Sequence, residues 1–310
     1  MTLDAKFSDG RPDPEFMAAA TSADYRRALS EFGLDMAALD ALSQTDDVGA
    51  FDEIGRQKGA GKMHHLDWDS QFFGVGSARI EGLYFADDDP DPYQTRSSVI
   101  DALLREADAA GDRFLNCRIS AGDAHLSKAL EDKGFQLFDV LNIYVTKLDD
   151  TASTVGSPPE DALDILEQCL DGMEWGRIYQ DPNIEHSLAE KFYRDTSAWI
   201  LSQDCHVTIA KVDGRKVGFA IGVVDQDTSK IMGRRHGILW LIAVDPEHRG
   251  KGIGGGLLQK FMSEFSTKMD LLEIGTQITN LPANRMYVKA GCRLLTEAHT
   301  YHRWAEPVPE

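Results

Sequence analysis

The chain has 310 residues and a formal net charge of −19, with 42% hydrophobic and 27% charged residues. This length can supply two domains with a core each, and the composition is ordinary for a globular protein. The acidic balance argues against nucleic acid and against an anionic membrane as partners, since both require basic faces. No run of about 20 apolar residues is present, so we expect no membrane-spanning segment.

The cysteines and the chain start indicate the expected compartment. The first residues, Met1-Thr2-Leu3-Asp4, do not form the charged and apolar pattern of a signal peptide. The cysteines are dispersed, without metal-ligand or redox spacing, so we expect reduced thiols in a cytoplasm and no metal. They are Cys117, Cys169, Cys205 and Cys292.

Residues 1–62 are acidic and poor in strand-forming residues. A helical apolar face between Tyr25 and Phe32 predicts a helix, and the short basic, glycine-containing stretch 58–62 predicts a flexible linker. We therefore expect a helical N-terminal extension that serves either as a cap or as a dimerisation arm. A homodimer stays open.

Residues 63–150 predict one α/β unit. Its expected strands are 77–80, 113–119 and 140–148, and its expected helices are 97–110 and 124–133. A polar segment rich in Pro, Gly and Ser, residues 151–160, marks the boundary with the second half of the chain.

Residues 151–310 predict a second α/β unit. Its expected helices are 161–171, 187–202, 255–265 and one around Tyr287, with an irregular stretch at 179–183. Its expected strands are 207–212, 217–224, 237–244, 272–278 and 297–304. Asp213-Gly214 between two apolar runs is a hairpin signal.

A glycine-rich turn follows the apolar strand that ends at Val244 and opens the next helix. The first N–H groups of a helix have no partner inside it, and glycines allow positive φ and close approach of a ligand. The helix dipole, Arg249 and Lys251 add positive charge. This arrangement is suited to a diphosphate.

The spacing Arg249-x-x-Gly252-x-Gly254 resembles the acetyl-CoA pyrophosphate loop of the GNAT N-acetyltransferases and matches neither a P-loop nor a dinucleotide fingerprint. The segment from Asn280 through Tyr287 to Gly291 is similar to the Asn-x-x-Ala-x-x-x-Tyr-x-x-x-Gly-Phe element of the same superfamily. Cys292 stands where that element has Phe.

The resemblance implies an α/β (α+β) chain of two GNAT folds in tandem, with mixed central sheets flanked by helices. Residues 124–148 repeat the order of helix, Gly-Phe and strand, but no Arg-x-x-Gly-x-Gly loop occurs before residue 151. We therefore expect a helical extension over 1–62, a degenerate GNAT-like domain over 63–150 and an acetyl-CoA-binding catalytic domain over 151–310.

The resemblance also implies site residues, with acetyl-CoA as co-substrate. Tyr287 is the expected general acid, although it also fits a helix aromatic that covers the sheet. Asn280 and a splayed strand are expected at the pantetheine arm. The expected cofactor-binding residues are Leu241, Ile242, Ala243, Val244, Arg249, Gly250, Lys251, Gly252, Ile253, Gly254 and Asn280.

The general base is left open by the sequence. His236, Glu273 and His186 are candidates, and so is deprotonation through water.

Three segments, 66–74, 179–193 and 299–304, resemble the TDP-fucosamine acetyltransferase group, which implies the 4-amino group of a nucleotide-linked amino-deoxysugar as acceptor. Such an anionic substrate would need a basic pocket. The candidates for it are Arg177, Arg194, Arg234 and Arg235. The aromatic residues near Trp68 fit either a core or a sugar platform.

Two other functions stay open. One is a GNAT enzyme for another amine, such as a polyamine, an antibiotic or a protein N-terminus, and the acidic charge favours such a cationic acceptor. The other is a non-catalytic acyl-CoA-binding protein.

Overall fold

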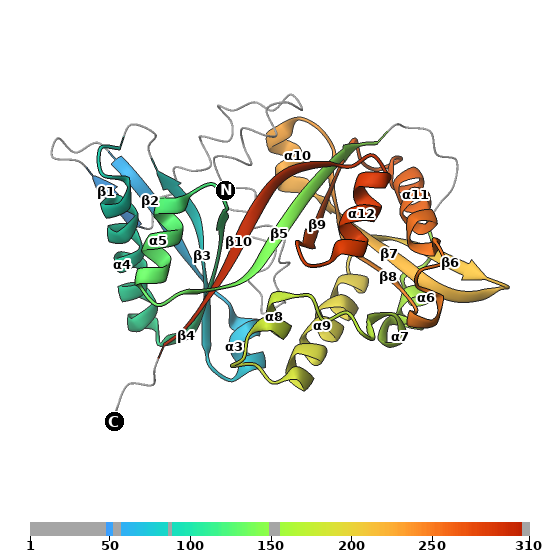
Figure 1. Ribbon diagram of the computed structural model, residues 1–310, viewed down its shortest axis with the longest axis horizontal. Coiled ribbons are helices and arrows are strands. Elements are labelled where there is room, and N and C mark those ends of the chain that lie inside the picture. Colours follow the sequence, from blue (N-terminus) through green and yellow to red (C-terminus); the bar gives the residue numbers. More distant parts are fainter. Residues whose placement is uncertain (1–47, 52–56, 86–88, 149–155, 306–310) are drawn as a thin grey trace. The chain divides into compact units, whose positions relative to one another are not determined.

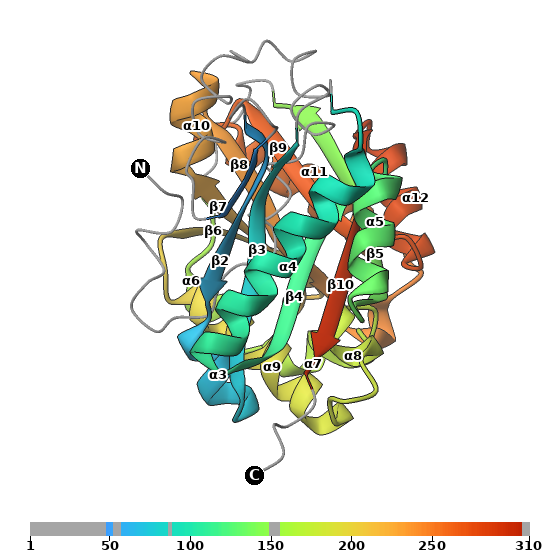
Figure 2. The same ribbon diagram turned by 90° about the vertical axis from the view of Figure 1, so that its left-hand side faces the viewer.

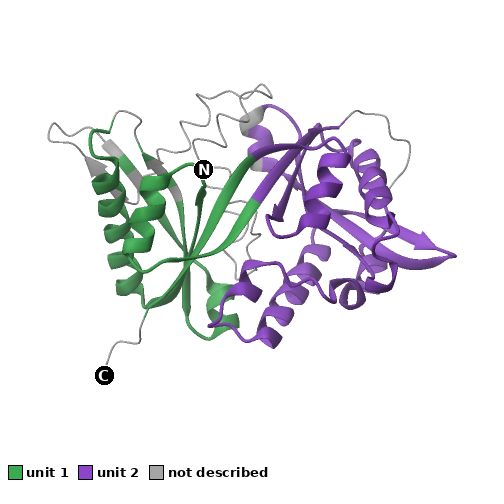
Figure 3. Cartoon of the chain, viewed as in Figure 1, with its two compact units in different colours: residues 1–141, 296–310 green, residues 142–295 purple. Residues whose placement is uncertain are grey.

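The computed structural model describes residues 48–51, 57–85, 89–148 and 156–305. They form two compact units, shown in Figure 3: unit 1 comprises residues 1–141 and 296–310, and unit 2 comprises residues 142–295. The helices expected before residue 48 lie outside the described residues. The domain division expected at residues 62 and 150 stays a prediction, because compact units do not reveal which segments fold independently. No helix in the described ranges is long and apolar enough to cross a membrane.

Unit 1 is a mixed sheet with two helices on one face (Figure 2). Its strands follow the order β1-β2-β3-β4-β10, with β3 and β4 parallel and the other pairs antiparallel. Strands β5 and β10 each cross the boundary between the units along the chain. The elements are β1 (Val48–Phe51), β2 (Gln57–His65), α3 (Asp67–Phe73), β3 (Gly76–Phe85), α4 (Pro92–Ala110), β4 (Asp112–Ser120), α5 (Ala124–Asp132), β5 (Gln136–Lys147) and β10 (Arg293–Trp304).

The core of unit 1 lies between the sheet and helices α4 and α5, where Ile80, Leu103 and Leu130 are fully buried. The aromatic residues of α3 pack locally. Phe72 stacks on Trp68 with 4.9 Å between ring centroids, and Phe73 lies edge-on to Phe114.

The prediction of a flexible linker at residues 58–62 is wrong, because these residues belong to strand β2. Its glycines are needed for packing. A Cβ at Gly59 would come within 2.8 Å of Phe85, and a Cβ at Gly61 would come within 2.8 Å of Leu103 on α4. Close approach of a helix and a side chain to the strand thus explains a composition that is typical of linkers.

In unit 2 the strands follow the order β9-β8-β7-β6 (Figure 1). Only β8 and β9 are parallel among these strands. Its elements are α6 (Pro159–Leu163), α7 (Leu166–Leu170), α8 (Arg177–Gln180), α9 (His186–Leu201), β6 (Cys205–Val212), β7 (Arg215–Asp225), α10 (Gln226–Met232), β8 (His236–Val244), the 3₁₀ helix η3 (Pro246–His248), α11 (Ile253–Phe265), β9 (Leu271–Gln277) and α12 (Leu281–Lys289).

Two local expectations in unit 2 are wrong, and one helix was not expected. The helix expected over 161–171 is broken into α6 and α7, because Ile165 leaves helical geometry at φ −122° and ψ 8°. The irregular stretch expected at 179–183 begins with the end of α8, and the sequence did not indicate α10. The hairpin at Asp213-Gly214 is confirmed, with φ of 49° and 80° at its two turn residues.

Both faces of the unit 2 sheet are covered. One apolar cluster joins the sheet to α11 and α12, and the other joins it to α6, α7 and α9. Leu258 and Phe261 are fully buried in the first cluster, and Phe219 and Cys169 in the second. The sheet is therefore a central layer that holds the helices on both sides in place.

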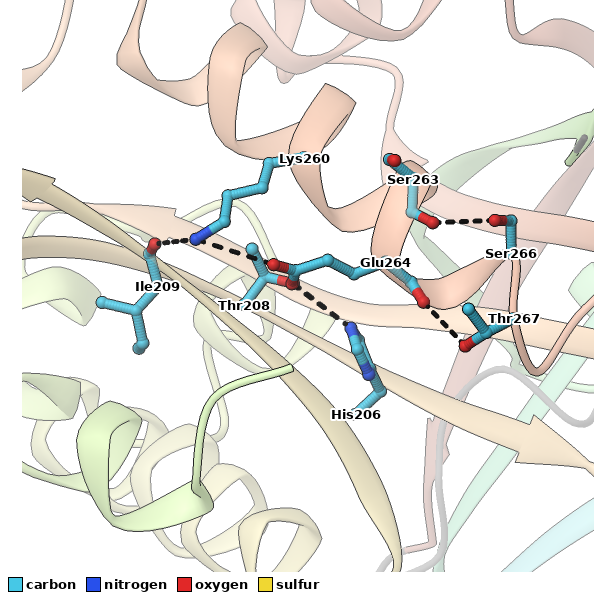
Figure 4. Close-up of polar contacts among 8 residues, drawn as sticks. All are labelled: His206, Thr208, Ile209, Lys260, Ser263, Glu264, Ser266 and Thr267. Carbon is cyan, nitrogen blue, oxygen red and sulfur yellow. Dashed lines mark hydrogen bonds and ion pairs between the residues drawn. The ribbon is translucent and has the colours of Figure 1, made fainter. Parts of the chain in front are cut away.

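The C-terminal end of α11 is fixed to the edge strand β6 by a buried polar group (Figure 4). The hydroxyl of Thr208 donates to Oε2 of Glu264 at 2.6 Å, and the imidazole of His206 lies 3.6 Å from the same oxygen. Lys260 donates to the carbonyl of Ile209 at 3.1 Å and lies 3.7 Å from Glu264. These contacts hold α11 against the sheet and thereby help to fix its glycine-rich first turn.

Candidate active site

Strands β8 and β9 separate before either of them ends. Their parallel pairing stops at Leu239 and Ile274 within the described part of unit 2. Strand β8 nevertheless continues to Val244, and β9 continues to Gln277. Strand β8 is buried up to Leu239 and mostly half-buried from Trp240 onward. The open edges present peptide groups to which an extended ligand can bind as a strand does.

A β-bulge at Trp240 accounts for this separation. Ile221 pairs with Leu241 and the next residue, Gly222, pairs with Leu239, so the register passes over Trp240. As a result, Trp240 and Leu241 both pack against the cluster formed with α7 and α9. A bulge bends and twists its strand, and here it turns residues 241–244 away from β9.

The glycine-rich loop lies directly beyond this strand. Gly250 and Gly252 have φ of 75° and 80°, a conformation that favours glycine, and an added Cβ at either would meet nothing within 4 Å. Gly252 caps α11 without a side-chain hydrogen bond, and the N–H of Gly256 is bonded to Gly252. The amides before Gly256 are therefore the first-turn N–H groups that have no acceptor inside the helix, which suits an anion.

The two basic side chains of the loop bind backbone carbonyl groups. Arg249 donates from Nε to Val244 at 2.8 Å, and from Nη2 to Cys169 at 3.1 Å and Asp171 at 2.6 Å. Lys251 donates to the carbonyl of Glu247 within the loop at 2.8 Å. Both charges thus remain beside the loop amides, but each already has oxygen acceptors.

Asp245, whose role the sequence did not indicate, organises the start of the loop. It is buried and accepts hydrogen bonds from Gln168 at 2.6 Å, from His248 at 2.9 Å and from the N–H of Glu247 at 3.1 Å. Burial acts to raise the pKa of Asp245, but the hydrogen bonds from Glu247 and His248 outweigh it and hold the pKa below its ordinary value. Asp245 is therefore a carboxylate.

Tyr287 lies in the apolar cluster below the point where the strands separate, with Leu239 and Ile274. Its side chain is 4% exposed, and its ring centroid is 5.7 Å from that of Tyr144. Burial, followed by the neighbouring Cys292 and Tyr144, raises the pKa of Tyr287 above its ordinary value. The phenol therefore keeps its proton at neutral pH, as a general acid must.

Asn280 and Asn284 fix the first turn of α12. Asn280 caps the helix by accepting from the N–H of Ala283 at 3.3 Å, and its amide donates to Thr276 at 3.2 Å. Asn284, which the sequence interpretation passed over, donates to the carbonyls of Gln277 and Asn280 at 2.9 and 2.8 Å. These two hydrogen bonds hold the side-chain amide of Asn284 in one orientation.

The three candidate bases lie in different environments. His236 and Glu273 are buried, and Nε2 of His236 is 3.3 Å from Glu273 while Nδ1 is 3.7 Å from Asp225. This group sits at the beginning of β8, at the opposite end of the strand from Val244. His186 is exposed and lies 3.5 Å from each of two carboxylates, those of Glu174 and Glu190. Only His186 is accessible to a substrate proton.

The arginines considered for a nucleotide are dispersed over unit 2. Arg177 lies on α8 and Arg194 on α9, whereas Arg234 and Arg235 precede β8. Arg194 is 3.9 Å from Glu167, and Arg235 binds Asp270 at 2.6 Å. Among the residues in the described ranges, no group of His, Cys, Asp and Glu could hold a metal ion.

A family model described as "Acetyltransferase (GNAT) family" matches residues 173–292, which include the open strand edges, the glycine loop and Tyr287. These residues are thus similar to the domains of that family. The GNAT fold is also found in solved structures of similar length. A tandem GNAT protein from the clavulanic acid biosynthesis pathway is 13% identical with a TM-score of 0.50, covering 93% of this chain and 96% of that chain.

A GCN5-related N-acetyltransferase from Sphaerobacter thermophilus is 12% identical with a TM-score of 0.54, covering 94% of each chain. These likenesses concern the fold alone. They confirm the expectation of tandem GNAT folds with mixed sheets flanked by helices.

Two curated relatives share sequence with parts of the chain. The spore coat polysaccharide biosynthesis protein SpsD of Bacillus subtilis (strain 168) is 30% identical over 151 residues, covering 47% of this chain and 50% of that protein. The L-2,4-diaminobutyric acid acetyltransferase of Nocardia farcinica (strain IFM 10152) is 30% identical over 95 residues, covering 31% and 45%. The chain thus spans about half the length of these relatives.

Unit 1 repeats the GNAT order of strands, with β2, β3, α4 and β4 corresponding to β7, β8, α11 and β9. The connection from β3 to α4, however, has the sequence Ala-Asp-Asp-Asp-Pro-Asp over residues 86–91, without a glycine or a cation. Carboxylates at this position repel a diphosphate. The charge of this connection therefore opposes a diphosphate site in unit 1.

Proposed function

We propose that the chain is an N-acetyltransferase that moves the acetyl group of acetyl-CoA to a primary amine by direct attack in a ternary complex. The observation that carries this proposal is the separation of β8 from β9 beyond Leu239 and Ile274. The glycine loop follows immediately, and the helix that it opens has no side-chain cap. The pantetheine arm has amides that can pair with a strand edge, and the diphosphate suits the amides at a helix start.

The residues present fit the co-substrate. The open edge of β8, Leu241–Val244, would hold the pantetheine, and the amides of residues 250–254 would hold the diphosphate. The open space above Gly250 and Gly252 leaves room for it. Asn280 would orient the start of α12 beside the pantetheine arm, since it caps that helix.

The reaction requires few groups. The neutral amine attacks the thioester carbon, a C–N bond forms, the C–S bond breaks, the amine loses a proton and the thiolate gains one. An N–H on the edge of β8 would polarise the thioester carbonyl, as an oxyanion donor does. Tyr287 would protonate the departing sulfur, since its phenol carries a proton at neutral pH. Deprotonation of the amine falls to water or to His186, since His236 and Glu273 are buried and paired with each other.

The acceptor that we favour is the 4-amino group of a nucleotide-linked amino-deoxysugar. The resemblance of segments 66–74, 179–193 and 299–304 to the TDP-fucosamine acetyltransferase group supports it, as does the match to SpsD, a protein named for polysaccharide biosynthesis. A small cationic amine is the second candidate. It is supported by the match to a diaminobutyric acid acetyltransferase, by the net charge of −19 and by the exposed carboxylates of Glu174 and Glu190.

The test is release of free CoA from acetyl-CoA with a panel of acceptors: TDP- and UDP-linked 4-amino-deoxysugars, L-2,4-diaminobutyrate, spermidine, an aminoglycoside and a peptide amine. Turnover with a nucleotide sugar alone would support the sugar acceptor, and turnover with a cationic amine alone would overturn it. A tight acetyl-CoA titration without turnover on any acceptor would favour a binding-only protein.

A further inference from the structure

We infer that Arg249 is a positioning residue that couples acetyl-CoA bound at the glycine loop to the segment 171–176, which connects α7 to α8. The inference rests on the proposed co-substrate site. It assigns the guanidinium a role other than the phosphate contact expected from the sequence. The coupled segment carries Glu174, whose carboxylate lies 3.5 Å from the exposed His186. The coupling would therefore order residues proposed to meet the amine acceptor, after acetyl-CoA has bound.

The contacts of Arg249 define the bridge. Nε of the guanidinium donates to Val244, the last residue of β8, and Nη2 donates to Cys169 and Asp171 at the end of α7. A positive charge at the C-terminal carbonyls of a helix is favourable, and hydrogen bonds from a charged donor are stronger than neutral ones. One side chain therefore joins the open strand, the loop and the start of segment 171–176.

A second tie runs parallel to the first. Gln168 on α7 donates to Asp245 at 2.6 Å, and Asp245 also accepts a hydrogen bond from His248 of the loop. The N–H of Asp245 is bonded to the carbonyl of Val217 on β7 at 2.9 Å. Asp245 is thus anchored to the sheet, and Arg249 is the member of the joint between α7 and the loop that belongs to the loop itself.

Glycines lie on both sides of the bridge. Gly250 follows Arg249 with φ 75°, and Gly172 follows Asp171 with φ 68°. A Cβ at Gly172 would lie 3.2 Å from Nη1 of Arg249, so the guanidinium fills the space beside that glycine. Two backbone segments with glycine freedom are therefore held to each other by one planar side chain.

Binding at the loop would act through this joint. A diphosphate on the loop amides fixes the backbone of residues 249–254, and hence the position from which Arg249 reaches the carbonyls of Cys169 and Asp171. Order gained at the loop is passed to segment 171–176, and by linkage a ligand that orders this segment raises the affinity for acetyl-CoA equally. The segment ends at Gly176, where a Cβ would come within 1.8 Å of the Tyr193 hydroxyl on α9.

The experiment is amide hydrogen exchange of peptides covering residues 171–176, measured with and without saturating CoA and paired with a CoA titration. Arg249→Ala is compared with Lys251→Ala. Both variants remove one positive charge from the loop, but only Arg249 reaches α7, since Lys251 is bonded to Glu247 inside the loop. A loss of affinity that comes from charge alone should be similar in the two variants.

In the wild type, CoA should slow exchange in 171–176 by about tenfold, and Lys251→Ala should keep this protection at saturation. Arg249→Ala should lose it. Gly172→Ala, which keeps both charges but strains the backbone beside the guanidinium, should weaken it as well. Arg249→Lys should restore part of it through a single hydrogen bond.

Two results would overturn the inference while leaving the proposed function intact. One is full CoA-dependent protection in Arg249→Ala. The other is CoA binding to the wild type without any protection of 171–176. Absence of CoA binding by the wild type would overturn the inference and the proposed co-substrate site together. If Arg249→Ala lowers CoA affinity far more than Lys251→Ala and still protects 171–176, Arg249 is a phosphate ligand.

Discussion

The hydroxyl of Tyr144 donates a 2.8 Å hydrogen bond to Oδ1 of Asn284, which lies 140 positions later in the chain. The amide of Asn142 donates to the same oxygen at 2.8 Å. Strand β5 and helix α12 are thereby joined beside Tyr287, whose ring lies against that of Tyr144. The tyrosine proposed as proton donor thus packs against Tyr144, whose own hydroxyl is held by Asn284.

Tyr287→Phe should lower kcat by about 100-fold or more and change the Kd of acetyl-CoA by less than about threefold, because it removes a proton donor but almost no contact area. The measurement is steady-state CoA release together with a binding titration. Tyr144→Phe is the matched control, since it removes the hydroxyl that binds Asn284 and leaves that of Tyr287. An unchanged kcat in Tyr287→Phe would remove this residue from the acid role.

Gly252→Ala should weaken acetyl-CoA binding by about tenfold, because φ of 80° is strained for alanine and the loop amides would shift. Gly256→Ala is its control, since Gly256 lies inside α11 and its N–H is already bonded to Gly252. That control should stabilise the fold by about 0.5–1 kcal/mol and leave binding nearly unchanged. Thermal unfolding and acetyl-CoA titration of both variants give the two readouts. Equal affinities for the two variants would contradict the assignment of the loop.

The sequence predicted the elements that have strong periodicity or a specific turn. The hairpin at Asp213-Gly214, the strand ending at Val244 and the helix that follows the glycine loop could all be predicted, because local residue chemistry determines them. Strand β2 could not, since the glycines at 59 and 61 are there to admit a helix and a side chain that come from later in the chain.

The site residues likewise divide into those that the sequence could predict and those that it could not. The loop glycines were apparent from their spacing, but the acceptors of Arg249 are carbonyls of Cys169 and Asp171, which lie about 80 residues earlier in the chain. The bulge at Trp240 depends on how β7 pairs with β8. The hydrogen bond that Asn284 accepts from Tyr144 depends on the path of β5. None of these relationships leaves a local pattern, because each requires knowledge of which distant segment lies alongside.

The buried His236 should make stability depend on pH in the alkaline range. Burial alone would lower its pKa, but Asp225 and Glu273 outweigh burial and raise the pKa to about 9. Since the folded pKa lies above the unfolded value of about 6.5, the stabilisation is complete below pH 6.5 and is lost as the pH rises through 9. His236→Gln should therefore cost on the order of 3 kcal/mol at pH 6 and much less at pH 10.

Unfolding of the two proteins by denaturant between pH 5 and pH 10 gives the measurement. His206→Gln is the control with the opposite sign. Burial lowers the pKa of His206, so the stability tied to its neutral form is present above pH 6.5 and is lost as the pH falls. Parallel pH profiles for wild type and His236→Gln would show that His236 is neutral in the folded protein.

Each chain should bind one molecule of acetyl-CoA, although it contains two units with the same order of strands. In unit 1 the pairing of β3 with β4 also ends early, at Ile80 and Cys117, so an opening between strands is present there too. What differs is the connection that follows: residues 86–91 carry four aspartates where unit 2 has glycines and two cations. Repulsion of a diphosphate by this connection leaves the loop of unit 2 as the site.

Isothermal titration of the wild type with acetyl-CoA measures the stoichiometry, and Gly252→Ala identifies the unit. The expected result is one site per chain, whose affinity falls in this variant. A second site that persists with wild-type affinity in Gly252→Ala would mean that an opening between strands suffices for binding without glycine amides, and would contradict the reasoning from loop charge.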